Sequence, residues 1–301
     1  MSALAGVFLS IILPIFVLIG VGVALDRLFR PDVRTLSKLN FYVFVPAFVF
    51  IKFLDADLAL RAMADIAAFR LLHVGVLLGL ALVLCRNRRL RPDRSVVTLA
   101  AMFFNGGNYG IPLVVFAWSE AMVGPLAIII MINNLVTFTL GIGLVQQEWR
   151  GLGAFARHMA TVPMIWAIGL ALGIDAAGWT VPPQVYDPLN YLADGLIPVA
   201  LLTLGVQLSR SRLARTALPL GVVTVLRLIV SPLVAAGLVL LLGVESPLAE
   251  MLIVVSGLPV AVNVFILSEE YGKDPELASQ AVFWTTLLSA GTLSVLLALV
   301  R

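Results

Sequence analysis

The chain has 301 residues, of which 61% are hydrophobic and only 12% are charged, and its mean hydropathy is +1.06. A soluble domain is about half apolar and about a quarter charged, so this composition excludes a water-soluble globular protein and indicates one that is embedded in lipid. The net charge of +3 does not point to nucleic acid, because the basic residues form short clusters between apolar runs, a pattern that membrane orientation explains.

Ten apolar runs are long enough to cross a membrane as helices, since a spanning helix needs about 20 residues. In chain order they cover 4–25, 35–54, 66–85, 96–117, 122–145, 159–177, 189–208, 217–242, 247–270 and 277–300. No basic residue precedes the first run, which we therefore interpret as a retained span rather than a signal peptide. The sequence predicts an all-α polytopic membrane protein.

Basic residues alternate between the loops that join these runs. The odd-numbered loops hold 15 of the 20, which are Arg27, Arg30, Arg34, Lys38, Arg86, Arg88, Arg89, Arg91, Arg94, Arg150, Arg157, Arg210, Arg212, Arg215 and Lys273. Because cytoplasmic loops are enriched in Lys and Arg, this alternation predicts that the odd-numbered loops are cytoplasmic. Both termini then lie outside the cytoplasm, and the expected location is the inner (plasma) membrane.

The chain divides into two halves that carry prolines at matching positions. Three pairs lie 149, 152 and 147 residues apart, namely Pro14 and Pro163, Pro46 and Pro198, and Pro112 and Pro259. Five spans in each half would insert the second half upside down relative to the first, which is the inverted-repeat plan of many secondary transporters. We predict a first five-helix repeat at 1–145, a cytoplasmic linker at 146–158 and a second, inverted repeat at 159–301.

Helix-breaking residues interrupt spans 4 and 9 at matching places. The first break is NGGNYGIP, residues 105–112, and the second is SGLPVAVN, residues 256–263. Glycine weakens a helix, and proline removes a donor but suits the first turn of a new helix. Each break is therefore predicted to end one half-helix and to start another. The predicted hinge residues are Gly106, Gly110, Pro112, Gly257 and Pro259.

Breaks of this kind favour a bound anion, because freed N–H groups and the positive ends of half-helix dipoles point into the middle of the membrane. At the breaks we predict substrate binding by Asn105, Gly107, Asn108, Val260 and Asn263. The alternative is a simple kink in each span, in which the asparagines bond freed backbone groups or a neighbouring helix.

Four segments carry a family resemblance. NGGNYGIPL (residues 105–113) resembles the fourth-span crossover of the auxin efflux carrier family, which includes plant PIN transporters and bacterial malate and malonate carriers. SGLPVAVNVFILSEEYG (256–272) is similar to the ninth-span crossover, VPAFVF (45–50) to the span 2 motif and LIPVALLTLGVQLS (196–209) to the span 7 motif. The resemblance covers essentially the whole chain, and the short linker resembles the compact bacterial type.

The resemblance implies a 5+5 inverted repeat with broken, crossing helices 4 and 9, like that of NhaA and bile acid transporters. Helices 1, 2, 6 and 7 would form a scaffold, helices 3–5 and 8–10 a transport domain, and two copies a homodimer. It also implies that Asn105 lines the substrate site and that Pro112 and Pro259 are the crossover prolines. Asn263 matches an asparagine that is frequent in the bacterial members but not in the plant ones.

Other polar residues lie inside the predicted spans. Arg227 is near the middle of span 8, where an arginine costs about 2.5–3.5 kcal/mol to insert. It needs a carboxylate substrate, a structural ion pair or freed backbone carbonyls as its partner. Thr203 and Gln207, one turn apart in span 7, are predicted to face the substrate cavity or to bond a neighbouring helix.

Three residues are candidates for coupling transport to a proton or cation: Asp194 in span 7, and Asp65 and Arg70 at the start of span 3. Asp194 is also compatible with a hydrated helix entry, and the pair in span 3 rests on the family resemblance. His73 and His158 share no ligand spacing with the lone Cys85, so neither a metal site nor a cofactor is predicted.

These features predict a secondary transporter that moves small organic anions, such as malate, malonate or auxin-like acids, by elevator-type alternating access. The sequence has no P-loop, so ATP does not drive it directly. The alternatives are a passive channel or sensor that reuses the fold, and an intramembrane enzyme, for which neither GxSxG nor HExxH is found. The expected partners are the anion, membrane lipid and a second copy of the chain, without nucleic acid.

Overall fold

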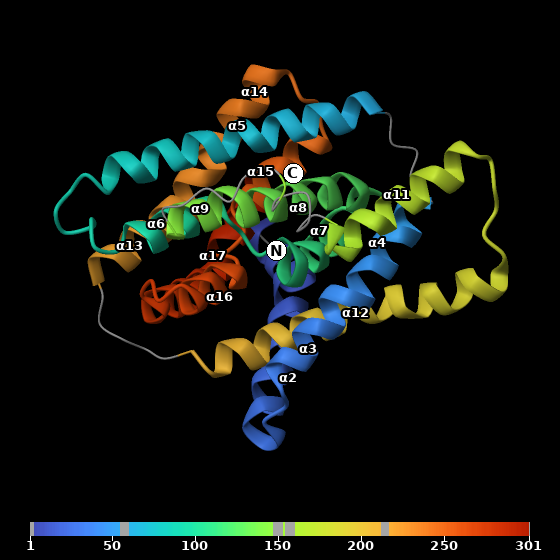
Figure 1. The fold of residues 1–301 in the computed structure, drawn as a ribbon, viewed down its shortest axis with the longest axis horizontal. Helices are drawn as coiled ribbons and strands as arrows, with labels where there is room; N and C mark the ends of the chain where they lie inside the picture. The colour runs from blue at the N-terminus through green and yellow to red at the C-terminus, as the bar shows by residue number, and fades with distance from the viewer. Residues whose placement is uncertain (1–2, 55–59, 147–152, 154–159, 212–216, 301) are drawn as a thin grey trace.

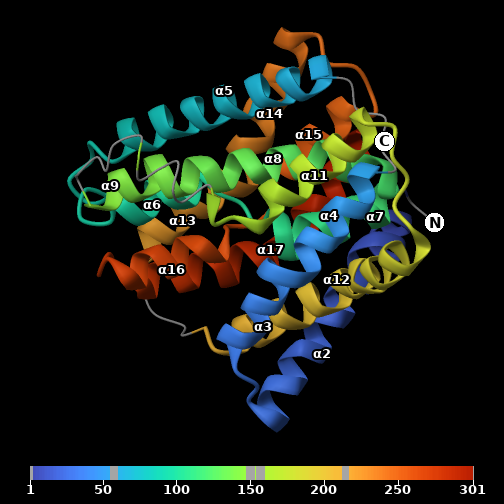
Figure 2. The same ribbon diagram turned by 45° about the vertical axis from the view of Figure 1, so that its right-hand side comes forward.

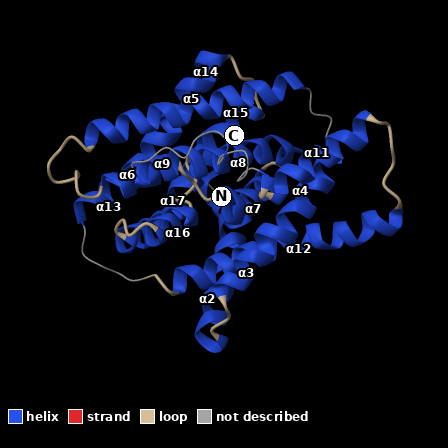
Figure 3. Cartoon of the chain, viewed as in Figure 1, coloured by secondary structure: helices blue, strands red, loops and turns tan. Residues whose placement is uncertain are grey.

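The computed structural model describes residues 3–54, 60–146, 153, 160–211 and 217–300. Within these ranges the chain forms helices and no β-strand (Figure 3). The helices of the first half are α1 Ala3–Val7, α2 Leu13–Phe29, α3 Val33–Leu39, α4 Val45–Leu54, α5 Leu60–Leu84, α6 Arg94–Met102, α7 Ile111–Ala117, α8 Val123–Val136 and α9 Ile142–Gln146. Those of the second half are α11 Pro163–Ala176, α12 Pro183–Ser209, α13 Ala217–Val225, α14 Ser231–Leu242, α15 Leu248–Ser256, α16 Val262–Glu270 and α17 Pro275–Val300.

Seven helical stretches of the described residues are long and apolar enough to cross a membrane. They are Leu4–Phe29, Val33–Leu54, Met63–Leu84, Glu120–Val145, Pro183–Ser209, Leu218–Leu242 and Pro275–Val300. The other three predicted runs take a different form: 96–117 and 247–270 are divided by the two breaks, and 159–177 contains the shorter helix α11. Most of the predicted linker at 146–158 lies outside the described residues.

Wide π-helical turns recur just before prolines. They cover Phe8–Ile12, Asn40–Phe44, Gly106–Gly110 and Leu226–Val230, and each ends two residues before a proline, at positions 14, 46, 112 and 232. A proline ring clashes with the carbonyl four residues earlier, and widening that turn relieves the clash while the helix continues. A further π turn, at Thr137–Gly141, separates α8 from α9.

The helices pack in two groups. In the first group α2 runs along α12, and α4 contacts both α11 and α12. In the second, α5 lies against α6, α8 and α14, while α17 contacts α13, α15 and α16. Figures 1 and 2 show α5 and α14 along one edge of the molecule and α2, α3 and α12 along the opposite edge. The two broken segments, α6–α7 and α15–α16, lie between these edges.

Glycine permits the closest helix contact of the first group. A Cβ atom on Gly22 of α2 would lie 2.3 Å from the carbonyl oxygen of Leu202, and one on Gly205 of α12 would lie 2.1 Å from that of Ile19. Both distances are far below a van der Waals contact, so the two backbones touch where neither residue has a side chain.

The entry to α3 is fixed by an N-cap. The Asp32 carboxylate accepts hydrogen bonds from the Thr35 hydroxyl at 2.5 Å and from the Thr35 backbone N–H at 3.0 Å. These bonds, with the Thr35 hydroxyl contributing most, hold the pKa of Asp32 below its usual range. The cap sets the start of the helix that carries Ser37 and Lys38, two residues that line the cavity described in the next subsection.

Candidate functional site

The two breaks lie side by side in the middle of the molecule. The chain leaves α6 after Met102 and α15 after Ser256, and Phe104 and Val260 then pair as an isolated antiparallel bridge. The Asn105 N–H donates to the Pro259 carbonyl at 2.9 Å, and the Ala261 N–H donates to the Phe103 carbonyl at 3.0 Å. These two bonds satisfy backbone groups that the breaks would otherwise leave unpaired inside the protein.

Each break is followed by a new helical segment. After the first, the Asn105 side-chain oxygen accepts from the Asn108 N–H at 3.2 Å, and Pro112 lies at the start of α7. After the second, the Val260 N–H donates to the Thr285 hydroxyl at 3.0 Å, and α16 begins. The predicted hinge residues therefore lie in the interrupted segments. Gly110 is one of them, and a Cβ there would lie 2.9 Å from the Leu258 side chain of the other break.

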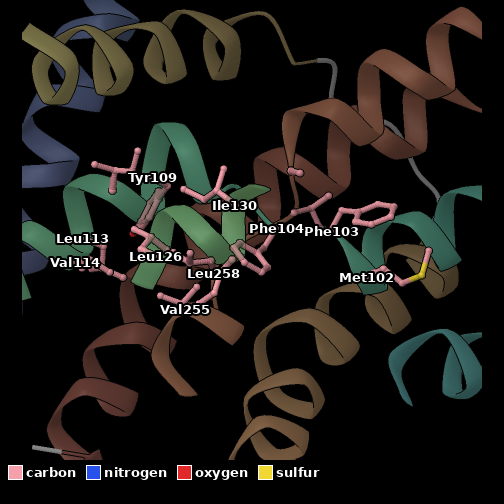
Figure 4. Close-up of a cluster of buried hydrophobic side chains, with 14 of the residues drawn as sticks. Met102, Phe103, Phe104, Tyr109, Leu113, Val114, Leu126, Ile130, Val255 and Leu258 are labelled. Atoms are coloured by element: carbon pink, nitrogen blue, oxygen red, sulfur yellow. The ribbon is translucent and has the colours of Figure 1, made fainter. Parts of the chain in front are cut away.

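Apolar side chains from several helices enclose the breaks. Figure 4 shows Phe104 and Tyr109 of the first break, Leu258 of the second and Ile130 of α8 in one buried cluster. The arginines, histidine and serine described next are also buried, which strengthens each of their hydrogen bonds and raises the cost of any group left unpaired.

Two arginines bind the carbonyl groups at the ends of the half-helices. The Arg227 guanidinium donates to the Ala101 carbonyl at 2.7 Å and also to the Ser256 carbonyl, and Arg70 donates to the Met102 carbonyl at 2.7 Å. Carbonyls at a helix C-terminus carry partial negative charge, which favours a cation there. In the structure, Arg227 therefore contacts freed carbonyls, which is one of the roles considered for it above.

His73 and Ser231 join the two arginines into one buried network. An arginine side chain has no acceptor, so its 2.9 Å contact with His73 Nδ1 makes that nitrogen the acceptor. His73 Nε2 then carries the proton and donates to the Ser231 carbonyl at 3.0 Å. The Ser231 hydroxyl accepts from Arg227 and donates to the Ser256 carbonyl at 2.6 Å.

The positive charges of this network face carbonyls and an aromatic ring rather than carboxylates. The guanidinium carbons of Arg70 and Arg227 lie 4.6 and 5.6 Å from the centre of the Phe104 ring. Both arginines are buried, with 1% and 0% of their surface exposed. Among the described residues, the salt bridges are Lys52 with Glu120 and Arg210 with Asp26, and neither includes Arg70 or Arg227.

A cavity of about 490 Å³ adjoins the two breaks. The breaks and α16 contribute Phe104, Asn105, Gly106, Gly107, Asn108, Ala261, Val262, Asn263, Ile266, Leu267 and Glu270. The span that begins with α3 contributes Ser37, Lys38, Asn40, Phe41, Tyr42 and Val45, and the remaining lining residues are Ile130, Asn133, Asn134, Met164 and Gln207. This volume suits a small organic molecule, and the lining mixes amide groups with apolar surface, as small-ligand sites do.

Five of the predicted substrate-binding residues line this cavity, which are Asn105, Gly107, Asn108, Gln207 and Asn263. Val260, Thr203 and Arg227 do not line it and have 0% exposure. The Thr203 hydroxyl instead accepts from the Asn40 amide at 3.1 Å and donates to the Val199 carbonyl at 2.7 Å, which is the interhelical bonding considered for it.

The three candidate coupling residues lie in different surroundings. Asp194 is exposed on α12 and accepts from the Asn190 amide at 3.4 Å. Asp65 is exposed on α5, whereas Arg70 of the same helix is buried in the arginine network. The cavity also contains residues that the sequence did not single out, among them Lys38, Asn40, Asn133 and Asn134. Two adjacent asparagines, Asn133 and Asn134, in the middle of an apolar run were the sequence feature that could have indicated a polar site there.

Comparison with known proteins shows that the chain is similar to membrane transporters. The profile of a family described as "Membrane transport protein" matches residues 148–297. A "Putative malonate transporter" of Rhizobium meliloti (strain 1021) is 26% identical over 305 residues, covering 97% of this chain and 95% of that protein. An "Uncharacterized transporter" of Methanothermobacter thermautotrophicus is 28% identical over 290 residues, covering 92% and 93%. "Auxin efflux carrier component 8" of Arabidopsis thaliana is 25% identical over 153 residues, covering 50% of this chain and 40% of that protein. The chain is a membrane transporter and belongs to the membrane transport protein family of the auxin efflux carriers.

Proposed function

We propose that the protein is a secondary transporter of small organic anions, chiefly mono- or dicarboxylates such as malonate and malate. The observation that carries this proposal is that the breaks beside the cavity contain hydrogen-bond donors without an acceptor. The Asn105 oxygen accepts from the Asn108 N–H, whereas the amide nitrogen of Asn105 has no hydrogen-bond partner although only 6% of the residue is exposed. A buried donor without an acceptor is a place where a carboxylate oxygen is expected to bind.

The second break also offers hydrogen-bond donors. α16 begins at Val262, and the first N–H groups of a helix have no acceptor within it. Val262 and Asn263 line the cavity, so this helix start offers donors and the positive end of its dipole. The malonate named in one relative's description, together with these donors, favours a small carboxylate over an auxin-like aromatic acid.

We further propose the ten-span, 5+5 inverted repeat, with units at 1–145 and 159–301 and a linker at 146–158. The paired prolines, the antiparallel contact between the breaks and the two helix groups support it. Spans 1, 2, 6 and 7 then form the scaffold, and spans 3–5 and 8–10 form the transport domain with spans 4 and 9 crossing. This domain would carry the anion by elevator-type movement, in a protein that forms a homodimer.

The position of the cavity supports an inward-facing state. Its lining includes Lys38, Gln207 and Glu270, which lie at the ends of their spans nearest the loops predicted to be cytoplasmic. At the opposite ends, Lys52 and Glu120 form a salt bridge of 2.5 Å, and the Trp118 indole N–H donates to Glu250 at 3.4 Å. These contacts close the side that we assign, with both termini, to the outside of the inner (plasma) membrane.

Uptake by liposomes that contain the purified protein tests the transport proposal. Labelled malonate and malate should enter saturably and should exchange with unlabelled substrate. Asn105→Ala and Asn263→Ala should each lower uptake at least about tenfold, because a hydrogen bond to a charged group contributes about 1.5–3 kcal/mol. Asn190→Ala is the matched control, since Asn190 bonds Asp194 outside the cavity and its removal should leave uptake unchanged.

Three outcomes would contradict the proposal in different ways. Undiminished uptake in both cavity variants would refute the site. Flux without saturation or exchange would identify a channel instead. Absence of flux, together with binding of the anion, would favour a sensor that reuses the fold.

A further inference from the structure

Asn133 lies near the C-terminal end of α8, on the wall of the cavity. It lines the cavity and is 5% exposed. Its backbone carbonyl accepts from the Thr137 hydroxyl at 2.7 Å, which is an ordinary contact within the helix. Its side chain, by contrast, reaches a different helix and contacts Arg70 of α5. This interhelical contact determines which atoms of the Asn133 side-chain amide can bind a ligand.

The contact with Arg70 fixes the orientation of the Asn133 amide. The Nη2 atom of Arg70 donates to the Asn133 side-chain oxygen. Since a guanidinium only donates, the atom that faces it must be the oxygen and not the amide nitrogen. The Asn133 nitrogen makes no hydrogen bond to the described residues, so its two N–H groups remain for a molecule in the cavity.

Arg70 is itself held in place by three further contacts. Its guanidinium donates to the Met102 carbonyl at 2.7 Å and to His73 Nδ1 at 2.9 Å, and it lies over the Phe104 ring at 4.6 Å. Phe104 is another lining residue of the cavity. Turning the Asn133 amide over would place an N–H group against this fixed cation, which the buried setting disfavours.

We infer that Asn133 is a further substrate-binding residue, which donates its amide N–H groups to the carboxylate, and that Arg70 is the positioning residue that imposes this polarity. The inference rests on the proposed transport of organic anions. Asn133 then repeats the arrangement of Asn105, whose oxygen is occupied by the Asn108 N–H. In both cases a neighbouring donor occupies the amide oxygen, so each of the two amides offers only N–H groups to an anion in the cavity.

Replacing Asn133 with Asp separates substrate binding from the structural contact. Asn133→Asp keeps an oxygen for Arg70 and can strengthen that bond, but it replaces the N–H groups by a second carboxylate oxygen. Asn134→Asp is the matched control, because Asn134 lines the same cavity and gains the same charge while the Asn133 amide is retained. Affinity for malonate is measured on purified protein by calorimetry, and folding is measured by thermal unfolding without ligand.

We expect Asn133→Asp to unfold at or above the temperature of the unmodified protein and to bind malonate at least about tenfold more weakly than Asn134→Asp does. Arg70→Gln should weaken malonate binding as well, and Arg70→Lys should restore part of it, because a lysine can still donate to the Asn133 oxygen. Equal affinity in the two Asp variants would overturn the inference and leave Asn133 as a structural partner of Arg70. If malonate and malate do not bind the unmodified protein, the proposed function fails instead.

Discussion

At the scale of single residues, the two buried arginines are held by backbone carbonyls. Arg70 and Arg227 meet the carbonyls of Met102, Ala101 and Ser256, which the breaks in α6 and α15 set free. An isolated charge in the membrane is costly, and an unpaired carbonyl there is also costly. Each group therefore satisfies the other, and the arrangement stabilises broken helices without a carboxylate that would compete with an anionic substrate.

Replacing Arg227 tests this role. Arg227→Gln should destabilise the fold, because each buried carbonyl that loses its partner costs about 1–3 kcal/mol. Thermal unfolding in detergent measures the loss, and Arg91→Gln at an exposed loop position is the matched control that should unfold like the unmodified protein. Malonate affinity of the folded Arg227→Gln protein should change little, since Arg227 does not line the cavity. A large loss of affinity with normal stability would make Arg227 a substrate ligand instead.

At the scale of helices, proline and glycine have separate effects. Three prolines, Pro14, Pro46 and Pro232, follow wide turns through which the helix continues. Only the segments that combine proline with glycine and polar residues, at Pro112 and Pro259, adjoin a true interruption. The glycines of α2 and α12 have a third effect, which is to let two helices touch.

The contact between α2 and α12 can be tested with alanine. Gly22→Ala should destabilise the protein by about 1–3 kcal/mol, the usual cost of overpacking, because its Cβ would lie 2.3 Å from the Leu202 carbonyl oxygen. Gly20→Ala is the control in the same helix, since nothing lies within 4 Å of its added Cβ. Thermal unfolding of the two variants provides the comparison, and equal unfolding temperatures would show that the helices can separate without cost.

At the scale of the whole molecule, the sequence predicted those features that depend on local pattern. Seven apolar runs coincide with helices of spanning length, and both breaks lie where glycine and proline interrupt the runs. Five of the predicted binding residues line the cavity. The contact between Arg70 and Asn133 was not predictable, because it joins helices far apart in sequence and depends on how α5 and α8 are rotated. For the same reason, sequence alone left the partner of Arg227 open.

The arginine network also bears on what drives transport. In transporters with broken helices, the C-terminal carbonyls of half-helices commonly coordinate the coupling cation. Here the carbonyls of Ala101, Met102 and Ser256 are already bound by guanidinium groups. A sodium ion at the same place would have to displace an arginine side chain from these carbonyls. The guanidinium groups of Arg70 and Arg227 therefore supply the positive charge at these carbonyls, and a separate sodium ion is not needed to neutralise them.

Malonate uptake should accordingly be the same when sodium is replaced by choline at equal ionic strength. Uptake of the dianion should instead respond to the membrane potential, because each elementary charge that crosses the membrane gains or loses about 2.3 kcal/mol per 100 mV. An inside-positive potential, set with potassium and valinomycin in liposomes, should therefore accelerate uptake in choline as much as in sodium. Loss of uptake in choline would place a sodium site elsewhere in the protein. Indifference to the potential would mean that a compensating cation, such as a proton, moves with the substrate.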